Sequence, residues 1–184
     1  DCGRRAVNLG TVGVEGAVTA EGSLTTPDPI RLHALLADLA EAGVSHAALE
    51  ASSHGLDQRR TDGLRLRAAA LTNITRDHLD YHGTMEAYVA AKLSLFGRVL
   101  PAGATAVLNA DDPVFPEAAA LCQARGQRVI SVGRAGEDLR LLGVAYDGAG
   151  QDLRFAWAGR ERGARLALIG GFQAENALVA AGLA

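Results

Sequence analysis

The 184-residue chain is poor in aromatic residues, in cysteine and in charge of one sign. Aromatic residues make up only 4% of it, it has two cysteines, and 18 basic residues against 21 acidic ones give a net charge of −3. The two cysteines, Cys2 and Cys122, are too few for a framework of several disulfides or of metal ligands, and such a low content fits a reducing cytosol. Non-specific nucleic-acid binding needs a basic face, which this composition does not supply, so we expect no nucleic-acid partner.

Long hydrophobic runs are also missing. Charged residues or glycine interrupt every apolar stretch before the roughly 20 residues that span a bilayer, and Asp1 to Arg5 lack the apolar segment of a signal peptide. We therefore expect a cytoplasmic monomer without a membrane partner. Hydrophobic residues still make up 48% of the chain, which suffices for a globular domain with a sizeable core.

Helix-like and strand-like segments alternate along residues 1–133. Helices are expected after the capping residues Asp28 and Thr84 and over residues 113–125. Apolar stretches predict buried strands over residues 44–50, 66–72, 105–109 and 128–132. The polar stretch over residues 52–63 shows neither the helical nor the strand periodicity of apolar residues. The alternation predicts an α/β fold whose mostly parallel sheet is covered by helices on both faces.

The pattern changes after residue 133. Short strands over residues 141–146, 153–158 and 165–169, separated by glycine-rich turns, predict a small antiparallel meander within residues 139–170. A further helix is expected to begin at Phe172, within the last segment, residues 171–184.

Three of the predicted strands are followed directly by polar residues. These segments are Glu50 to His54, Thr72 to His78 and Asn109 to Asp112. Ligands of open parallel sheets bind beyond the carboxyl ends of the strands. Glu50 and His78 are therefore candidates to face one hard cation such as Mg²⁺. The alternative for each is structural: a glutamate that caps a helix and a histidine packed in a loop.

Five motifs follow one another along the chain. They are Thr25-Thr26-Pro27, Glu50-x-Ser52-Ser53-His54-Gly55-Leu56, Thr72-Asn73-Ile74-Thr75-Arg76-Asp77-His78-Leu79-Asp80-Tyr81-His82-Gly83, Ala90-Ala91-Lys92 and Asn109-Ala110-Asp111-Asp112. In this order they resemble the central, ATP-binding domain of the Mur ligases of peptidoglycan synthesis, a fold similar to that of P-loop NTPases. The resemblance covers nearly the whole chain. Within the family, the chain is most similar to the members that add a diamino acid.

The resemblance implies an enzyme that uses ATP to join a diamino acid to UDP-N-acetylmuramoyl-L-alanyl-D-glutamate through an acyl phosphate. Negative charge gathers on phosphoryl oxygens in such a reaction, so metal ions and cationic groups are the expected tools. It further implies that Glu50, His78 and Lys92 bind Mg²⁺, with His78 and Lys92 catalytic and Lys92 carbamylated. Carbamylation converts a cation into a carboxylate that can hold Mg²⁺. A solvated surface lysine is the plain alternative.

The resemblance also implies two sets of binding residues. The residues that match contacts to the UDP-muramoyl substrate are Thr25, Thr26, Ser52, Gln58 and Arg60. Guanidinium groups suit phosphate and carboxylate oxygens, although Arg59 is an alternative to Arg60, and either can be a plain surface residue. Asn109, Phe172 and Asn176 match nucleotide contacts. Gln173 stands where the family has asparagine, next to Phe172.

One family motif, the phosphate loop Gly-Thr-x-Gly-Lys-Thr/Ser, does not occur in the sequence. Gly10-Thr11-Val12-Gly13 does not replace it, because no lysine follows. We therefore expect a partial central domain, without the loop and the flanking domains, that is inactive by itself. The alternatives are a folylpolyglutamate synthase of the same fold, a hydrolase that activates water with Glu50, Asp77, His78 and a metal, and a binding module without turnover.

Overall fold

The computed structural model describes residues 3–21 and 24–184, which form two compact units. The first unit comprises the chain up to Leu64 together with Asp80–Leu95, and the second comprises Arg65–Leu79 and Phe96–Ala184. Each unit has its own hydrophobic core. Asp1 and Cys2 lie outside the described residues, and the domain bounds expected from the sequence stay a prediction.

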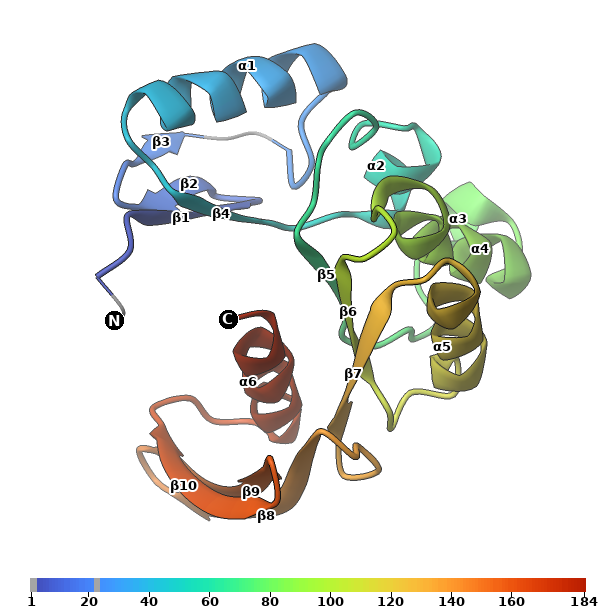
Figure 1. Cartoon of the computed structure of the whole chain (residues 1–184). Helices are drawn as coiled ribbons and strands as arrows, with labels where there is room; N and C mark the ends of the chain where they lie inside the picture. Colours follow the sequence, from blue (N-terminus) through green and yellow to red (C-terminus); the bar gives the residue numbers. More distant parts are fainter. Residues whose placement is uncertain (1–2, 22–23) are drawn as a thin grey trace. The chain divides into compact units, whose positions relative to one another are not determined.

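A four-stranded sheet and one long helix make up the core of the first unit (Figure 1). The strands lie in the order β3-β2-β1-β4, where β1 (Ala6–Gly10), β2 (Gly13–Gly16) and β3 (Ala20–Glu21) are antiparallel and β4 (His46–Leu49) is parallel to β1. The sequence patterns do not predict β1, β2 and β3, because Asn8 and Glu15 interrupt the apolar residues of β1 and β2, both of which include glycine, and β3 has only two residues.

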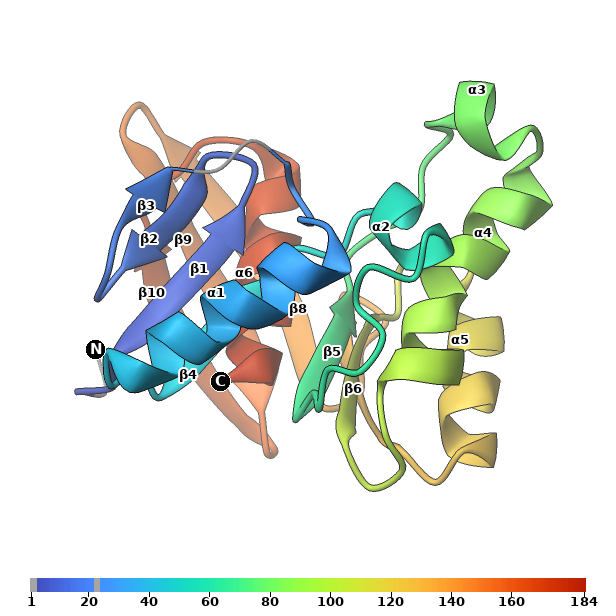
Figure 2. The same ribbon diagram turned by 90° about the horizontal axis from the view of Figure 1, so that it is seen from above.

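Helix α1 (Pro29–Glu41) begins where the sequence predicts. The Asp28 carboxylate accepts a hydrogen bond from the backbone N–H of Arg31 at 3.0 Å, which satisfies one of the free donors of the first turn. Leu32 and Leu39 are buried against the sheet, and Figure 2 shows the helix lying along it. Gly43, at φ 79°, takes the left-handed conformation that follows many helices.

The strand predicted over residues 44–50 is confirmed as β4, but the expectation that it is buried is wrong. His46, Ala47 and Ala48 are exposed. β4 is the edge strand of this sheet, and its His46 and Ala48 lie on the same face as the exposed Ala6 and Asn8 of β1, opposite the face that packs on α1.

Three further helices lie wholly or largely in the first unit. They are α2 (Ser53–Asp57), α3 (Leu79–His82) and α4 (Met85–Ser94), and α2 packs on α4. Thr84 caps α4 as predicted, and a π-helical turn, η1 (Leu95–Val99), follows it. The stretch over residues 52–63, which showed no period, contains α2. A helix of one turn is too short to show a hydrophobic periodicity in the sequence. It has an N-cap nevertheless, since Ser52 Oγ accepts a hydrogen bond from the backbone N–H of Gly55 at 3.1 Å.

The second unit is a six-stranded sheet with a helix on each face (Figure 1). The order is β10-β9-β8-β7-β6-β5, with β5 (Ala68–Leu71), β6 (Thr105–Asn109), β7 (Arg128–Gly133) and β8 (Leu139–Asp147) parallel and β9 (Gly150–Trp157) and β10 (Arg160–Leu166) antiparallel. Helix α5 (Phe115–Ala124) covers one face, and α6 (Gly171–Leu183) the other. This confirms the α/β fold class with a mostly parallel sheet.

The predicted antiparallel meander is present, but it continues the parallel sheet through the β7–β8 pair. The prediction of its third strand at residues 165–169 is wrong, because β10 spans Arg160–Leu166. The turn at Ala158 and Gly159, both with positive φ, starts β10 earlier than the apolar pattern suggests. The carbonyls of Leu168 and Gly170 instead accept hydrogen bonds from the Gln151 amide.

Arg165 connects the exposed strand β10 to β8 and β9 by ion pairs. The Arg165 guanidinium lies 2.7 Å from Asp147 Oδ1 and 3.2 Å from Asp152 Oδ2. The hydrogen bond from Arg165 lowers the pKa of Asp147 from 3.8 to about 2, helped by the backbone N–H of Ala149. Among the described residues, no helix is both long enough and apolar enough to cross a bilayer.

Candidate functional site

Thr26 connects two loops of the first unit through a buried hydroxyl. The side chain is 1% exposed, and its Oγ1 donates to the carbonyl oxygen of Glu50 at 2.9 Å. It also accepts from the backbone N–H of Ser52 at 3.0 Å and lies 3.2 Å from Ser52 Oγ. Thr26 therefore holds the segment that follows β4, including Glu50 and Ser52, in place. Its direct contact with a substrate stays a prediction.

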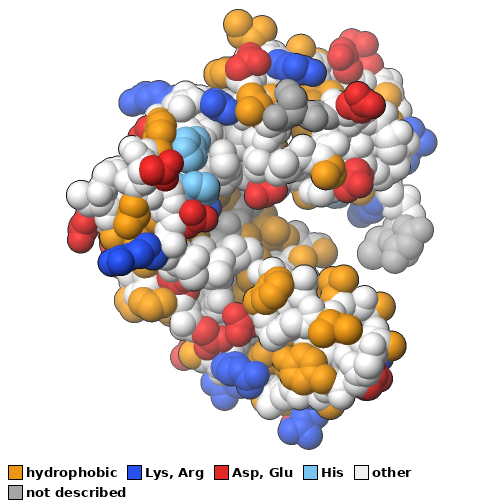
Figure 3. Space-filling view, turned by 180° about the vertical axis from the view of Figure 1, so that it is seen from behind, with side chains coloured by type: hydrophobic (Ala, Val, Ile, Leu, Met, Phe, Trp, Pro, Cys, Tyr) orange, Lys and Arg blue, Asp and Glu red, His pale blue; other side chains and the backbone are white. Residues whose placement is uncertain are grey.

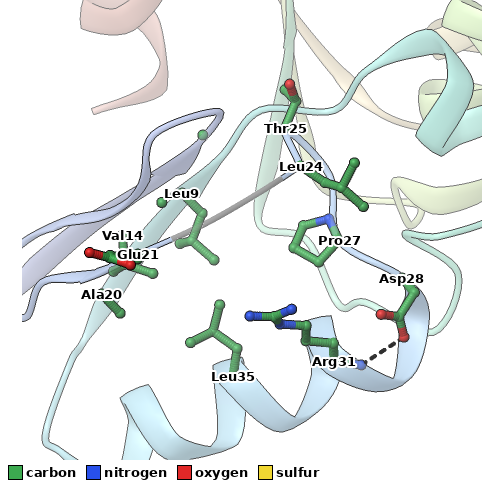
Figure 4. A pocket seen from close by; sticks show the side chains of 12 residues that line it. Leu9, Val14, Ala20, Glu21, Leu24, Thr25, Pro27, Asp28, Arg31 and Leu35 are labelled. Carbon is green, nitrogen blue, oxygen red and sulfur yellow. Dashed lines mark hydrogen bonds between the residues drawn. The ribbon is translucent and has the colours of Figure 1, made fainter.

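The structure brings Thr25 beside a residue that none of the sequence motifs assigns to substrate binding. Its hydroxyl shares a 2.7 Å hydrogen bond with that of Thr11, on the turn between β1 and β2. Thr25 also lines a cavity of about 180 Å³ between this sheet and α1, where Leu9, Pro27 and Leu35 point inward (Figure 4).

Gly55 lies so close to Thr26 and Ser52 that a side chain does not fit. A Cβ at this position would lie 2.8 Å from Thr26 Cβ and 3.0 Å from Ser52 Oγ. We expect Gly55→Ala to push these two residues apart and to lower the free energy of unfolding by about 1–3 kcal/mol, as overpacking does. Urea unfolding measures this loss. Gly143→Ala is the matched control, because a Cβ there meets nothing within 4 Å, and an equal loss in both variants would contradict the prediction.

Arg60 and Gln58 form a second linked pair, joined to Thr26. Arg60 Nη1 donates to the carbonyl oxygen of Thr26 at 2.8 Å, and its Nε donates to Gln58 Oε1 at 3.0 Å, as does its Nη2. Three of the five guanidinium N–H groups thus fix the orientation of the plane. Arg59 makes a different contact, 3.9 Å from Asp62. Of the two arginines, Arg60 is the one that the structure connects to the other predicted binding residues.

Glu50 and Lys92, two of the three predicted metal ligands, lie in the first unit. Glu50 is exposed just beyond the carboxyl end of β4, with its carboxylate over Gly10. Lys92 is half-buried on α4, with Nζ 5.9 Å from the centroid of the Tyr88 ring. The composition carries a signal that the motifs do not, since Lys92 is the single lysine among the 18 basic residues of the chain. Arginine supplies positive charge everywhere else, which favours a role for the Lys92 amine beyond its charge.

His78, the third predicted ligand, lies in the second unit. Its φ of 53° is rare for a residue other than glycine, and such strain concentrates at functional sites. The Asp77 carboxylate accepts from the backbone N–H of His78 at 2.8 Å and lies 3.5 Å from its Nε2. Within the described ranges, no three His, Cys, Asp or Glu side chains are grouped as a metal site. A cation shared by Glu50, His78 and Lys92 stays a prediction.

Asn109 has a structural role that its motif does not indicate. It is 3% exposed, its Nδ2 donates to the carbonyl oxygen of Thr72 at 2.8 Å, and its Oδ1 accepts from the N–H of Asp111 at 3.0 Å. Asp112 accepts from the N–H of Ile74 at 2.6 Å. Side chains at the end of β6 and just beyond it therefore hold the backbone that follows β5. A nucleotide contact of Asn109 stays a prediction.

Phe172 and Asn176 lie one helical turn apart near the start of α6, on the same side of the helix. Both are exposed, Phe172 by 61%. Exposed hydrophobic side chains, Tyr146, Trp157 and Phe172 among them, occur on β8, β9 and α6, and Figure 3 shows hydrophobic groups gathered on this part of the second unit. An exposed aromatic ring beside an amide suits the stacking and edge recognition of a base. A nucleotide contact here stays a prediction.

A family model, described as the Mur ligase middle domain, matches residues 3–184. The chain belongs to the Mur ligase family. Two curated relatives are named UDP-N-acetylmuramoyl-L-alanyl-D-glutamate--2,6-diaminopimelate ligase. The one from Caulobacter vibrioides is 53% identical over 98% of this chain, and the one from Bradyrhizobium diazoefficiens is 50% identical over 99%. The chain spans 39% of the length of each relative.

Solved structures agree with this assignment to the Mur ligases. A structure of a ligase with the same name superposes with a TM-score of 0.85 at 32% identity and covers 96% of this chain and 36% of that one. A mutant of the L. casei protein FPGS gives a TM-score of 0.71 at 17% identity, covering 97% of this chain and 50% of that one. At that identity the second match shows a common fold alone. The family resemblance inferred from the five sequence motifs is thus confirmed.

Proposed function

We propose that the whole protein in which this Mur ligase chain occurs joins a diamino acid to UDP-N-acetylmuramoyl-L-alanyl-D-glutamate with the use of ATP. The observation that carries the proposal is the 53% identity, over 98% of this chain, to a ligase named for that substrate. The diamino acid we propose is 2,6-diaminopimelate, since both curated relatives described above are named for it.

We assign the binding of the nucleotide sugar to Thr25, Ser52, Gln58 and Arg60. The hydrogen bonds of the first unit support this, because Arg60 is held by Gln58 and by the Thr26 carbonyl before any ligand arrives. A fixed guanidinium binds phosphate or carboxylate oxygens without first losing the freedom of a long side chain. The role of Thr26 is to hold this group together.

The metal we propose is Mg²⁺, with Glu50, His78 and a carbamylated Lys92 as its protein ligands. The donor chemistry supports this, since the Glu50 carboxylate and a carbamate on Lys92 offer the oxygen atoms that Mg²⁺ prefers. When bound, the cation would neutralise charge that develops on the phosphoryl oxygens. Glu50 presents its carboxylate at the carboxyl end of a strand parallel to β1, exposed to an incoming ion. Phe172 and Asn176 are the residues we assign to the adenine base of ATP.

The proposal is tested by phosphate release from ATP by the whole protein, in buffer with Mg²⁺ and bicarbonate. We expect release only when UDP-N-acetylmuramoyl-L-alanyl-D-glutamate and 2,6-diaminopimelate are both present. Lysine and ornithine, offered separately, test the choice of diamino acid. If the folded protein releases no phosphate with any of the three, the proposed function is wrong.

A further inference from the structure

Tyr81 lies in the first unit between two groups of side chains. Its hydroxyl donates to Asp57 Oδ2 at 2.8 Å, and Gln58 Nε2 donates to the same hydroxyl oxygen at 3.1 Å. Its ring centroid lies 4.1 Å from that of His54, and His82 lies edge-on to the ring with 4.8 Å between centroids. Both the ring and the hydroxyl of Tyr81 are therefore fixed, although the residue is 41% exposed.

The direction of these hydrogen bonds determines which way Gln58 faces. A phenol has one proton, and Tyr81 gives it to the carboxylate of Asp57, so the hydroxyl oxygen can only accept from Gln58. Gln58 must then turn its amide nitrogen toward Tyr81 and its amide oxygen toward Arg60. The reversed amide would place an N–H group against the guanidinium of Arg60, where both groups are donors.

We infer that Tyr81 is a positioning residue for the substrate-binding pair Gln58 and Arg60. The hydrogen bonds run without a break from Asp57 through Tyr81, Gln58 and Arg60 to the carbonyl oxygen of Thr26. Tyr81 acts by fixing the amide of Gln58, which in turn fixes the guanidinium of Arg60. The inference rests on the proposed function, because Gln58 and Arg60 bind the nucleotide sugar only under that proposal.

The first test is Tyr81→Phe in the whole protein, which keeps the ring against His54 and His82 and removes the hydroxyl. We expect the KM for the nucleotide sugar to rise about fivefold, the size of effect typical of one lost hydrogen bond. We expect kcat and the KM for ATP to stay within about twofold, because the hydroxyl of Tyr81 is bonded to Gln58 and Asp57 and to no residue assigned to ATP. A general loosening of the packing would lower kcat as well. Ser45→Ala is the control, since it removes an exposed hydroxyl of the same unit, which donates to the carbonyl oxygen of Arg5 at 3.2 Å just before β4, and it should leave all three constants unchanged.

The second test is to make the same change in a Gln58→Ala background. If Tyr81 acts through Gln58, Tyr81→Phe should raise the KM for the nucleotide sugar no further once Gln58 is gone. An equal rise in both backgrounds would overturn the inference, as would an unchanged KM in the single variant. A wild-type protein without ligase activity would instead contradict the proposed function, so the two failures are distinguishable. Equilibrium unfolding of each variant identifies any that misfolds.

Discussion

Replacing Lys92 by arginine is expected to lower the kcat of the whole protein by about 100-fold or more, a loss typical of removing one group that stabilises transition-state charge. Arginine keeps the positive charge and a long side chain, but its guanidinium stays protonated and forms no carbamate. If Lys92 serves only as a cation, arginine should replace it well. Lys92 is the only lysine in a chain otherwise supplied with arginine, which makes this substitution informative.

Steady-state kinetics measures the loss, and the bicarbonate dependence of the rate provides its control. In buffer freed of carbon dioxide, the wild-type protein should lose activity and regain it when bicarbonate is added. The Lys92→Arg variant should respond to neither treatment. Arg128→Lys, an exchange of the same two residue types at an exposed position of the second unit, should keep its activity. A Lys92→Arg variant with more than half of the wild-type kcat would rule out the carbamate and leave the ligase assignment standing.

Replacing Asp112 by alanine is expected to lower the free energy of unfolding by about 3 kcal/mol, because two backbone donors lose a charged acceptor. The Asp112 carboxylate is 7% exposed and accepts from Ile74 N at 2.6 Å and from Val114 N at 2.8 Å. Without the carboxylate, these N–H groups are left in a largely dry site. The loss should also loosen the segment after β5 that carries His78.

Urea unfolding measures this change in stability, and two further variants calibrate it. Asp112→Asn keeps one acceptor oxygen and should cost about half as much. Asp152→Ala removes an exposed carboxylate whose bond to Arg165 lies on the surface of the sheet, and it should cost less than about 1 kcal/mol. Equal losses for Asp112→Ala and Asp152→Ala would contradict the view that Asp112 matters through its buried hydrogen bonds.

Elements with strong local signals could be predicted from the sequence. Asp28 and Thr84 mark α1 and α4 because capping is a bond between neighbours in the chain. The prediction of β6 is correct at both ends, since the apolar residues 106–108 are bounded by Thr105 and Asn109 and lie on an interior strand of the sheet. Strands β1, β2 and β3 and helix α2 are not predicted, because none of them has a continuous apolar run and each is stabilised by partners that lie elsewhere in the chain.

The candidate site was predictable as a set of residues but not as an arrangement. The family resemblance points to Thr26, Ser52, Gln58 and Arg60, and the structure connects them by hydrogen bonds. Tyr81 belongs to the motif over residues 72–83, but its contact with Gln58 could not be predicted, because the two residues lie 23 positions apart and nothing in the sequence indicates that they meet. For Asn109, the sequence predicts that the residue belongs to a site, but it does not predict the hydrogen bond from its amide to the carbonyl oxygen of Thr72.

Strand β10 has a consequence for how the protein behaves at high concentration. It is the outermost strand of its sheet among the described residues, and its outer edge therefore offers backbone groups to any other extended chain. Its exposed residues include Arg160, Glu161 and Arg162, with Gly163 at its centre. Charged side chains and a glycine make a poor template for another strand, so this edge resists sheet-to-sheet association and the amyloid-like aggregation that follows from it.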